Sequence, residues 1–327
     1  MPKNINLFIR VVDNLWDIWF AWELIRATEE AFPNRYFFDI WTDSVEKVAY
    51  FFEKNTILNR HSQIRKIEDI EKKSANISFL LFHHPIPANY QYHADELFLR
   101  IDYLSFDPEW ITHHGKEHID SREGRKIIEI TPSPLSWSAG LIPPPSHLIS
   151  KHELAKKYGL DHEKKWITIF AYQKTLLEHL ELEALEGAQV LLLWTDGRER
   201  QDEKNIVSLP FLSLIEFSSF IHLSAWAIVR GEVSLISALQ LGTPILWDMY
   251  KEIGGFHPEQ AEQFLDWQCA NDGFRDLFYR LNGEKEWRVK ITEIDRYFRV
   301  HQMKKFEPAY SIITEIQKYI DKYHISL

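Results

Sequence analysis

The apolar pattern changes period early in the chain. Residues 6–12 (NLFIRVV) form a short run rich in branched apolar side chains, which predicts a strand. The following apolar side chains recur at the i, i+3, i+4, i+7 spacing of one helix face. These are Ile18, Ala21, Trp22 and Ile25. The loop between the two elements carries Asp13 and Asn14, and Asp17 is well placed to cap the helix.

Strand-like runs and helical stretches alternate along the rest of the chain. Further strands are expected at 35–43, 77–84, 96–104, 166–172, 190–196, 205–211, 226–232 and 243–250. Helices are expected from 173 to about 186 and at 213–224, 234–242, 258–270 and about 307–323. This alternation on both sides of the proline-rich stretch 141–150 predicts an α/β protein with two doubly wound domains.

The proline-rich stretch sets the predicted domain boundaries. We expect an N-terminal domain at 1–148, a C-terminal domain at 149–300, and a C-terminal helix in 301–327 that can cross back to the first domain. Ligands of doubly wound sheets bind beyond the carboxyl ends of the strands. The loops that follow the predicted strands therefore hold the candidate site.

Composition narrows the class of protein. The chain has 327 residues, is 45% hydrophobic, and contains a single cysteine, which excludes an internal disulfide framework and predicts a reducing compartment. No apolar run approaches the roughly 18 residues of a membrane span, and the N-terminus does not resemble a signal peptide. We expect a cytoplasmic protein. A net charge of -10 disfavours nucleic-acid binding but leaves room for a local basic pocket.

The segment VRGEVS, residues 229–234, carries the strongest local signal. It lies where a predicted strand meets a predicted helix, and a helix N-terminus favours an anion. Arg230 offers a fork of donors suited to a diphosphate, and Glu232 can accept hydrogen bonds from sugar hydroxyls. Helix capping near Ser234 and a salt bridge of Arg230 explain the same residues equally well.

Two other sets of residues have both a functional and a structural explanation. Phe211 and Phe217 can hold a flat base by stacking, although aromatic residues at this spacing more often belong to a core. Asp17 can act as a general base, although an N-cap and an Asx-type turn at Asp13 also explain the pair. No metal site is expected, because the histidines at 83–84 and 113–118 lack the HExxH order and have no nearby cysteines.

Taken in order, these stretches resemble the EarP family, the bacterial protein-arginine rhamnosyltransferases that modify elongation factor P. The family's opening motif reads approximately VVDN-Y-GDIGV-x-WRLA, and this chain reads VVDNLWDIWFAWELI. A PFLPQ-type segment and an RGEDS motif correspond to PFLSL and RGEVS, with Phe211 nineteen residues before Arg230 as in the family. The WAGKP-VWHIYPQ stretch corresponds to QLGTPILWDMYKE, and the resemblance continues to about residue 267.

The resemblance implies a fold and a reaction. The fold is GT-B, with two Rossmann-like domains facing across a cleft. The donor is dTDP-β-L-rhamnose, the acceptor is an arginine of elongation factor P, and transfer proceeds with inversion and without a metal or other cofactor. In this chain Asp17 is implied as the general base, and Asp13 as a carboxylate that helps to bind the acceptor guanidinium.

The resemblance also carries nucleotide-sugar contacts over to this chain, all in its second half. They are Phe170, Tyr172, Phe211, Phe217, Arg230, Glu232, Ser234 and Tyr250. The two phenylalanines of the PFLSLIEF segment are implied to flank the thymine, and residues 230–234 to hold the diphosphate and the neighbouring sugar. The aromatic pair at 170 and 172 is implied to line the donor pocket, with residue 250 near the phosphates.

The chain departs from the family inside its motifs. Trp16 and Trp19 replace the glycines of GDIG, and Val233 replaces the acidic residue of RGEDS. We expect the two tryptophans to narrow the cleft mouth beside Asp17. Three functions therefore stay open. They are an arginine rhamnosyltransferase with a reshaped pocket, a related glycosyltransferase with another sugar or acceptor, and a non-catalytic nucleotide-binding or scaffold protein.

Overall fold

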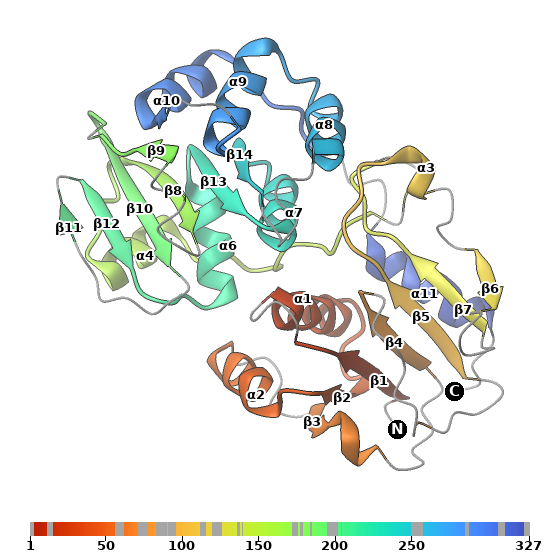
Figure 1. The fold of residues 1–327 in the computed structure, drawn as a ribbon. Coiled ribbons are helices and arrows are strands. Elements are labelled where there is room, and N and C mark those ends of the chain that lie inside the picture. Colours follow the sequence, from red (N-terminus) through yellow and green to blue (C-terminus); the bar gives the residue numbers. More distant parts are fainter. Residues whose placement is uncertain are drawn as a thin grey trace. The chain divides into compact units, whose positions relative to one another are not determined.

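The structure, a computed structural model, divides the chain into two compact units (Figure 1). Unit 1 comprises Met1–Pro143 and Glu307–Leu327, and unit 2 comprises Pro144–Phe306. The residues that the structure describes are 3–11, 16–55, 62–70, 77–82, 90, 96–111, 116–119, 126–135, 138, 140–171, 176, 179–183, 185–194, 202–203, 205–249, 258–284, 288–306 and 311–323. The predicted linker, 141–150, spans the junction of the two units.

A mainly parallel sheet forms the centre of unit 1. Its described strands are β1 (Lys3–Ile9), β2 (Tyr36–Thr42), β3 (Ser62–Lys66), β4 (Ile77–Leu81), β5 (Leu97–Ile101), β6 (Glu117–Ile119) and β7 (Lys126–Ile130). They lie in the order β3-β2-β1-β4-β5-β7-β6, and β6 is antiparallel to β7. From β1 the chain adds β2 and then β3 on one side of β1. It then adds β4 on the other side of β1. The order of strands therefore reverses between β1 and β4.

Successive residues of the central strands are buried, which explains why their sequences are mainly apolar runs. All five residues of β4 are buried, and so are the last five of β1. A parallel sheet covered by helices on both faces needs such apolar runs rather than alternation. The described helices of this unit are α1 (Trp16–Ala31), α2 (Val45–Lys54), α3 (Pro108–Ile111) and α11 (Ile312–Lys322), with a 3-10 turn η1 (Ile67–Asp69).

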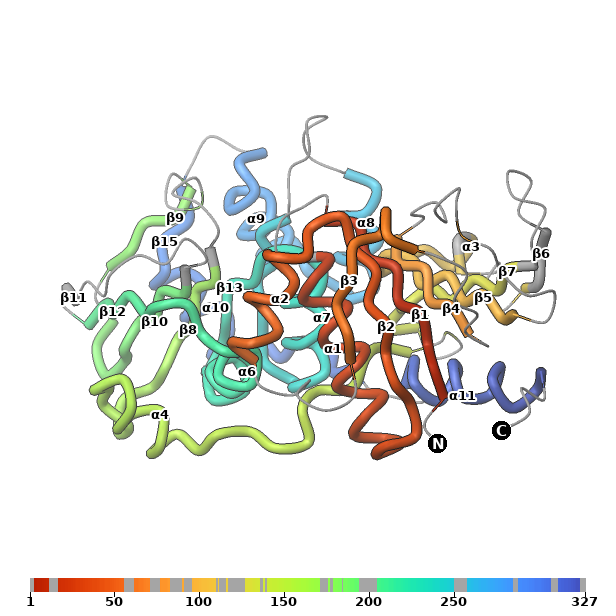
Figure 2. The backbone as a smooth tube through the Cα atoms, turned by 90° about the horizontal axis from the view of Figure 1, so that it is seen from below, coloured from red at the N-terminus to blue at the C-terminus, as the bar shows by residue number. Residues whose placement is uncertain are grey.

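The last described helix, α11, belongs to unit 1 although it follows all of unit 2 in sequence. It packs beside α1, and Leu141 bridges to Ser311 just before α11 begins. In both views the blue α11 lies among the red and yellow elements of unit 1 (Figures 1 and 2). Its isoleucines at 312, 313, 316 and 320 are buried, so the helix contributes to the core of this unit.

Unit 2 repeats the doubly wound plan. Its strands are β8 (Lys165–Ala171), β9 (Leu180–Glu181), β10 (Ala188–Trp194), β11 (Asp202–Glu203), β12 (Ile206–Leu209), β13 (Trp226–Arg230), β14 (Ile245–Asp248) and β15 (Val289–Lys290). Its described helices are α4 (Lys151–Tyr158), α6 (Leu214–Leu223), α7 (Glu232–Leu241), α8 (Pro258–Trp267), α9 (Asp272–Leu281) and α10 (Ile291–Val300). The sheet order β11-β12-β10-β8-β13-β14 reverses between β8 and β13.

Most predicted elements agree with the structure, and the differences have local causes. The first strand begins at Lys3 instead of residue 6, because Lys3 and Asn4 are polar and not buried and so hide its start in the sequence. The helix expected from 173 to 186 is wrong at its end, where Leu180–Glu181 forms β9 and pairs with β15. Within the described parts of the chain, every helix is too short or too polar to cross a membrane.

Candidate active site

Three of the sequence-predicted donor residues, Phe170, Arg230 and Glu232, lie where the strand order of unit 2 reverses. Doubly wound sheets bind ligands at this point, beyond the carboxyl ends of the strands. Phe170 is the second-last residue of β8, and Arg230 is the last residue of β13. Because β8 and β13 are neighbouring parallel strands, both residues lie at the same edge of the sheet. Glu232 opens α7 directly after β13.

A single glycine turns the chain from β13 into α7. Gly231 is the N-cap of α7 and has φ 73°, a left-handed value that glycine tolerates without strain. The buried hydroxyl of Ser234 donates to the backbone oxygen of Arg230 and, at 3.2 Å, to that of Gly231. Ser234 therefore stabilises the turn. The first backbone N–H groups of α7 have no partner inside the helix and form a site that suits an anion.

An ion pair holds the Arg230 guanidinium at this edge. Its Nη1 lies 3.2 Å from Oδ2 of Asp248, the last residue of β14, and both side chains are at most about one-tenth exposed. The two residues are direct partners in the sheet register. Arg230 therefore makes the salt bridge that the structural explanation predicted. Sequence reasoning missed Asp248, whose only local signal is a carboxylate at the end of a strand.

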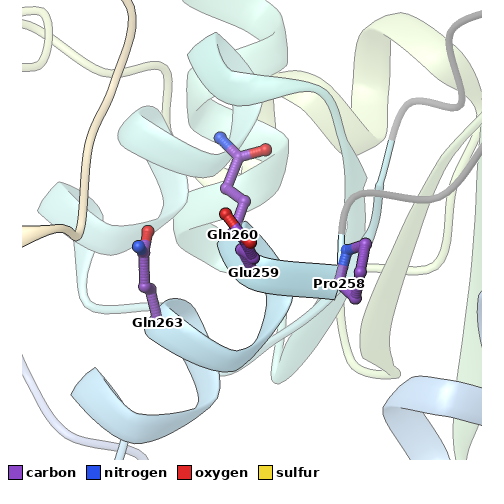
Figure 3. A pocket seen from close by; sticks show the side chains of 4 residues that line it. All are labelled: Pro258, Glu259, Gln260 and Gln263. Atoms are coloured by element: carbon purple, nitrogen blue, oxygen red, sulfur yellow. The ribbon is translucent and has the colours of Figure 1, made fainter. Parts of the chain in front are cut away.

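Glu232 is held by a residue from a different helix. The amide Nε2 of Gln260 donates to Oε1 of Glu232 at 3.2 Å. Gln260 also lines a pocket of about 300 Å³ whose described lining is completed by Pro258, Glu259 and Gln263 (Figure 3). The half-buried Glu232 carboxylate thus stands between the N-terminus of α7 and the first turn of α8, where it can accept hydrogen bonds from a sugar.

The three described aromatic candidates differ in burial. Phe170 and Phe217 are both buried and meet edge to face, with ring centroids 4.9 Å apart and planes at 67°. Phe211 is only partly buried. Phe217 lies in α6, which begins with a capping box between Ser213 and Glu216. The structure thus places Phe217 in the core beneath the strand ends and leaves Phe211 more accessible to a ligand.

In unit 1 the strand order reverses beside the helix that carries Asp17. Asp17 is the second residue of α1, and its side chain is only 3% exposed. A carboxylate in the first turn of a helix is stabilised by the helix dipole. Its burial gives it the low-dielectric surroundings in which a charged group interacts strongly with a bound cation.

Trp19, which replaces a family glycine, is part of the buried packing of α1. Its side chain is 4% exposed. One turn later, burial raises the pKa of the Glu23 carboxyl, and Arg26 and the Trp19 indole counteract part of that rise. Glu23 and Arg26 are paired at 2.7 Å. The buried tryptophan is therefore linked to the Glu23–Arg26 pair through Glu23. Its narrowing of the cleft mouth stays a prediction.

Several predicted residues lie outside the described parts of the chain. They are Asp13, Tyr172, Tyr250 and the side chain of Trp16. The side chains of the histidines at 83–84, 113–114 and 118 also lie outside. Among the residues that the structure does describe, no three His, Cys, Asp or Glu side chains are grouped so that they could hold a metal ion.

Comparison with known proteins places this chain in a family. A family model described as Elongation-Factor P (EF-P) rhamnosyltransferase EarP matches residues 5–307. The chain belongs to the EarP family. A protein-arginine rhamnosyltransferase of Neisseria meningitidis serogroup B is 21% identical over 303 residues, which cover 80% of this chain and 77% of that relative. One of Pseudomonas aeruginosa is 23% identical over 316 residues, which cover 81% of each chain.

Solved structures show the fold. An EarP structure described for arginine glycosylation of translation elongation factor EF-P is 18% identical and aligns over 98% of this chain and 99% of that one, with a TM-score of 0.51. The S. aureus MnaA–UDP structure is 11% identical over 99% and 97%, with a TM-score of 0.50. The predicted family and the predicted GT-B class are confirmed, and the protein is a glycosyltransferase of EarP type.

Proposed function

We propose that this protein transfers L-rhamnose from dTDP-β-L-rhamnose to an arginine side chain of elongation factor P, with inversion and without a metal. The observation that carries this proposal is the turn from β13 into α7. There the family's RGE residues stand at the reversal point of the unit 2 sheet, with Arg230 fixed by Asp248 and Glu232 fixed by Gln260. We propose the cytoplasm as the place of action, where the acceptor is made.

Unit 2 supplies the leaving-group chemistry. As the sugar leaves, negative charge grows on the diphosphate. The guanidinium of Arg230 and the first N–H groups of α7 stabilise that charge, and both are already in position before the reaction. Glu232 binds a sugar hydroxyl and so fixes the anomeric carbon relative to the diphosphate. Phe211 stacks on the base, while Phe170 and Phe217 support it from the core.

Unit 1 supplies the acceptor chemistry. A guanidinium stays protonated and is therefore a poor nucleophile. The buried carboxylate of Asp17, assisted by Asp13, holds the acceptor guanidinium and accepts its proton as nitrogen attacks the anomeric carbon. One C–N bond forms, the bond to the diphosphate oxygen breaks, and the proton goes to Asp17. A single displacement of this kind inverts the configuration at the anomeric carbon.

A second candidate is a related glycosyltransferase with another sugar or acceptor. It is favoured by Val233, a buried apolar residue in the first turn of α7 where the family motif is acidic. A donor with a different sugar would then replace dTDP-rhamnose while the same turn holds its diphosphate.

Mass measurement of co-expressed elongation factor P separates these candidates. We expect wild-type protein to add one deoxyhexose and Asp17→Asn to add none within the same time. The matched control is Glu46→Gln, which neutralises an exposed carboxylate in the first turn of α2 and is expected to behave as wild type. Full transfer by Asp17→Asn would exclude this residue as the base. An added mass other than a deoxyhexose would favour the second candidate.

A further inference from the structure

An exposed tyrosine marks the carboxyl edge of the unit 1 sheet. Among the described residues, the large apolar side chains that are exposed are Tyr50, Tyr103 and Val300. Tyr50 lies on α2, and Val300 ends α10. Tyr103, at 43% exposure, instead follows β5 by two residues and so stands beyond the carboxyl end of a central strand. Substrates of doubly wound sheets bind at this edge.

A stack of three rings connects Tyr103 with the helix that carries Asp17. Tyr103 lies nearly parallel to Phe82, with centroids 4.6 Å apart and planes at 19°. Phe82 in turn meets Phe20 edge to face, with centroids 4.9 Å apart. Phe20 is three residues after Asp17 on α1, so both project from the same face of that helix. The inner end of the stack therefore lies on the helix face that carries the proposed base, and Tyr103 forms its exposed outer end.

Backbone hydrogen bonds fix the position of the stack. The N–H of Phe82, directly after β4, donates to the oxygen of Ile101 at 2.9 Å. The N–H of Asp102 donates to the oxygen of Ile130 at 2.9 Å, and Oδ1 of the buried Asp102 accepts from the N–H of Tyr103 at 2.8 Å. The loops after β4 and β5 are thus tied to each other and to β7. Tyr103 is presented to the solvent by a supported backbone.

We propose that the exposed ring of Tyr103 is the docking surface for the acceptor loop that carries the reacting arginine. Flat and cationic groups, the arginine side chain and peptide planes among them, stack on tyrosine faces. The ring stack lies where the strand order reverses between β1 and β4, and Asp17 supplies the complementary charge for the guanidinium. Asp17 then holds the reacting group, and Tyr103 holds the loop that presents it. This inference rests on the proposed function.

Steady-state kinetics with elongation factor P as variable substrate tests the docking surface. We expect Tyr103→Ala to raise the acceptor KM about fivefold, which is about 1 kcal/mol at 1.4 kcal/mol per tenfold change. We expect kcat and the affinity for dTDP to stay within about twofold, because the proposed role of the ring is to hold the acceptor loop and not the reacting group or the donor. Tyr103→Phe keeps the face and is expected to restore the wild-type KM. Tyr50→Ala removes a 56% exposed tyrosine of the same unit and is the matched control.

The outcomes separate this inference from the proposed function. Tyr103→Leu keeps an apolar side chain over Phe82 but has no flat face. This variant replaces Tyr103→Ala in the test if the alanine variant does not fold. Its acceptor KM is expected to rise as well. An unchanged acceptor KM in Tyr103→Ala or Tyr103→Leu, with active wild-type protein, overturns the docking surface alone. A wild-type protein that transfers nothing to elongation factor P overturns both.

Discussion

At the scale of single residues, the buried pair of Arg230 and Asp248 is the central contact of the proposed donor site. Removing one partner of a buried ion pair leaves a charge without compensation, at a cost of about 3 kcal/mol or more. We expect Asp248→Ala to lower the free energy of unfolding by that amount. We also expect dTDP to raise its melting temperature more than it does for wild type, because a diphosphate replaces the missing carboxylate.

Thermal unfolding with and without dTDP provides the measurement. The matched control is Asp266→Ala, which breaks an exposed pair with Arg275 and is expected to cost only about 0.5 kcal/mol. If Asp248→Ala and Asp266→Ala have the same stability and the same response to dTDP, Asp248 has no special role at this site.

Gln260 is the residue-scale support for Glu232. The hydrogen bond from its amide helps to hold the Glu232 carboxylate in the position in which we propose that it binds the sugar. We expect Gln260→Ala to lower kcat/KM for the donor about tenfold. Gln263→Ala, which removes an amide one turn further along the same pocket, is the control and is expected to change it less than threefold. Equal effects of the two substitutions would contradict a specific role for Gln260.

Trp19 shows why the tryptophans of the opening motif cannot simply be replaced by glycine. The side chain is buried, so Trp19→Gly leaves a large cavity and also places glycine inside α1. We expect a loss of about 3 kcal/mol or more in unfolding free energy, measured by chemical denaturation. A variant with wild-type stability would contradict the buried packing. Activity of Trp19→Gly should therefore be compared only at temperatures where the variant is folded.

At the scale of elements, α10 holds the amino ends of β8 and β13 through Asp295. Its carboxylate accepts from the Trp226 indole at 2.9 Å and from Arg299 at 2.7 Å, and it pairs with Lys165. Burial alone raises the pKa of Asp295, but Lys165, Trp226 and Arg299 together hold that pKa below its ordinary value. These contacts lie at the amino ends of the strands, opposite the proposed donor site, so we assign Asp295 a role in stability.

The contacts of Asp295 predict that the stability of the protein depends on pH. A carboxyl whose folded pKa is lowered contributes stability above its unfolded pKa of about 3.9, and this contribution is lost as pH falls through the folded pKa. We expect Asp295→Asn to reduce stability near pH 7 and to show a weaker loss than wild type as pH falls below about 4. The affinity for dTDP is expected to stay unchanged. Parallel pH profiles for the two proteins would contradict this assignment.

The elements also show how far the sequence determined the fold. Strong periodic segments such as α6 and α8 were predicted within a few residues, because their apolar spacing and caps are local signals. Helix α4 was not predicted, although Ser150 and Glu153 form a capping box, because the preceding prolines indicated a linker. Helices α9 and α10 also went unpredicted.

The residues of the candidate site also fall into two groups, those that the sequence predicts and those that it does not. Arg230 and Phe170 lie at the carboxyl ends of strands and Glu232 lies just beyond one, so the sequence predicts them at the same side of the sheet. Asp248 and Gln260 were missed, because their importance comes from partners on other elements. No local pattern identifies such partners. The structure also changed the interpretation of Phe217 and Ser234, whose neighbours are the core and the backbone turn.

At the scale of the whole molecule, the two units are predicted to divide the two substrates between them. Asp17 and Arg230 belong to different units, so changes to them should affect different measurements. We expect Arg230→Lys to weaken dTDP binding about tenfold, because lysine lacks the planar fork of donors. We expect Asp17→Asn to bind dTDP as wild type does while transfer falls by about 10² or more. Calorimetry with dTDP checks both, and weaker binding by Asp17→Asn would contradict the division.

The return of α11 to unit 1 has a consequence for biosynthesis. Unit 2 is one continuous stretch of chain, whereas unit 1 needs α11, which the ribosome makes after every residue of unit 2. Domains generally fold as units while the chain emerges. The donor unit can therefore reach its native state first, while the carboxylate-bearing α1 waits with an uncovered apolar face until the buried isoleucines of α11 arrive. We therefore expect unit 1 to complete its core later than unit 2 during synthesis.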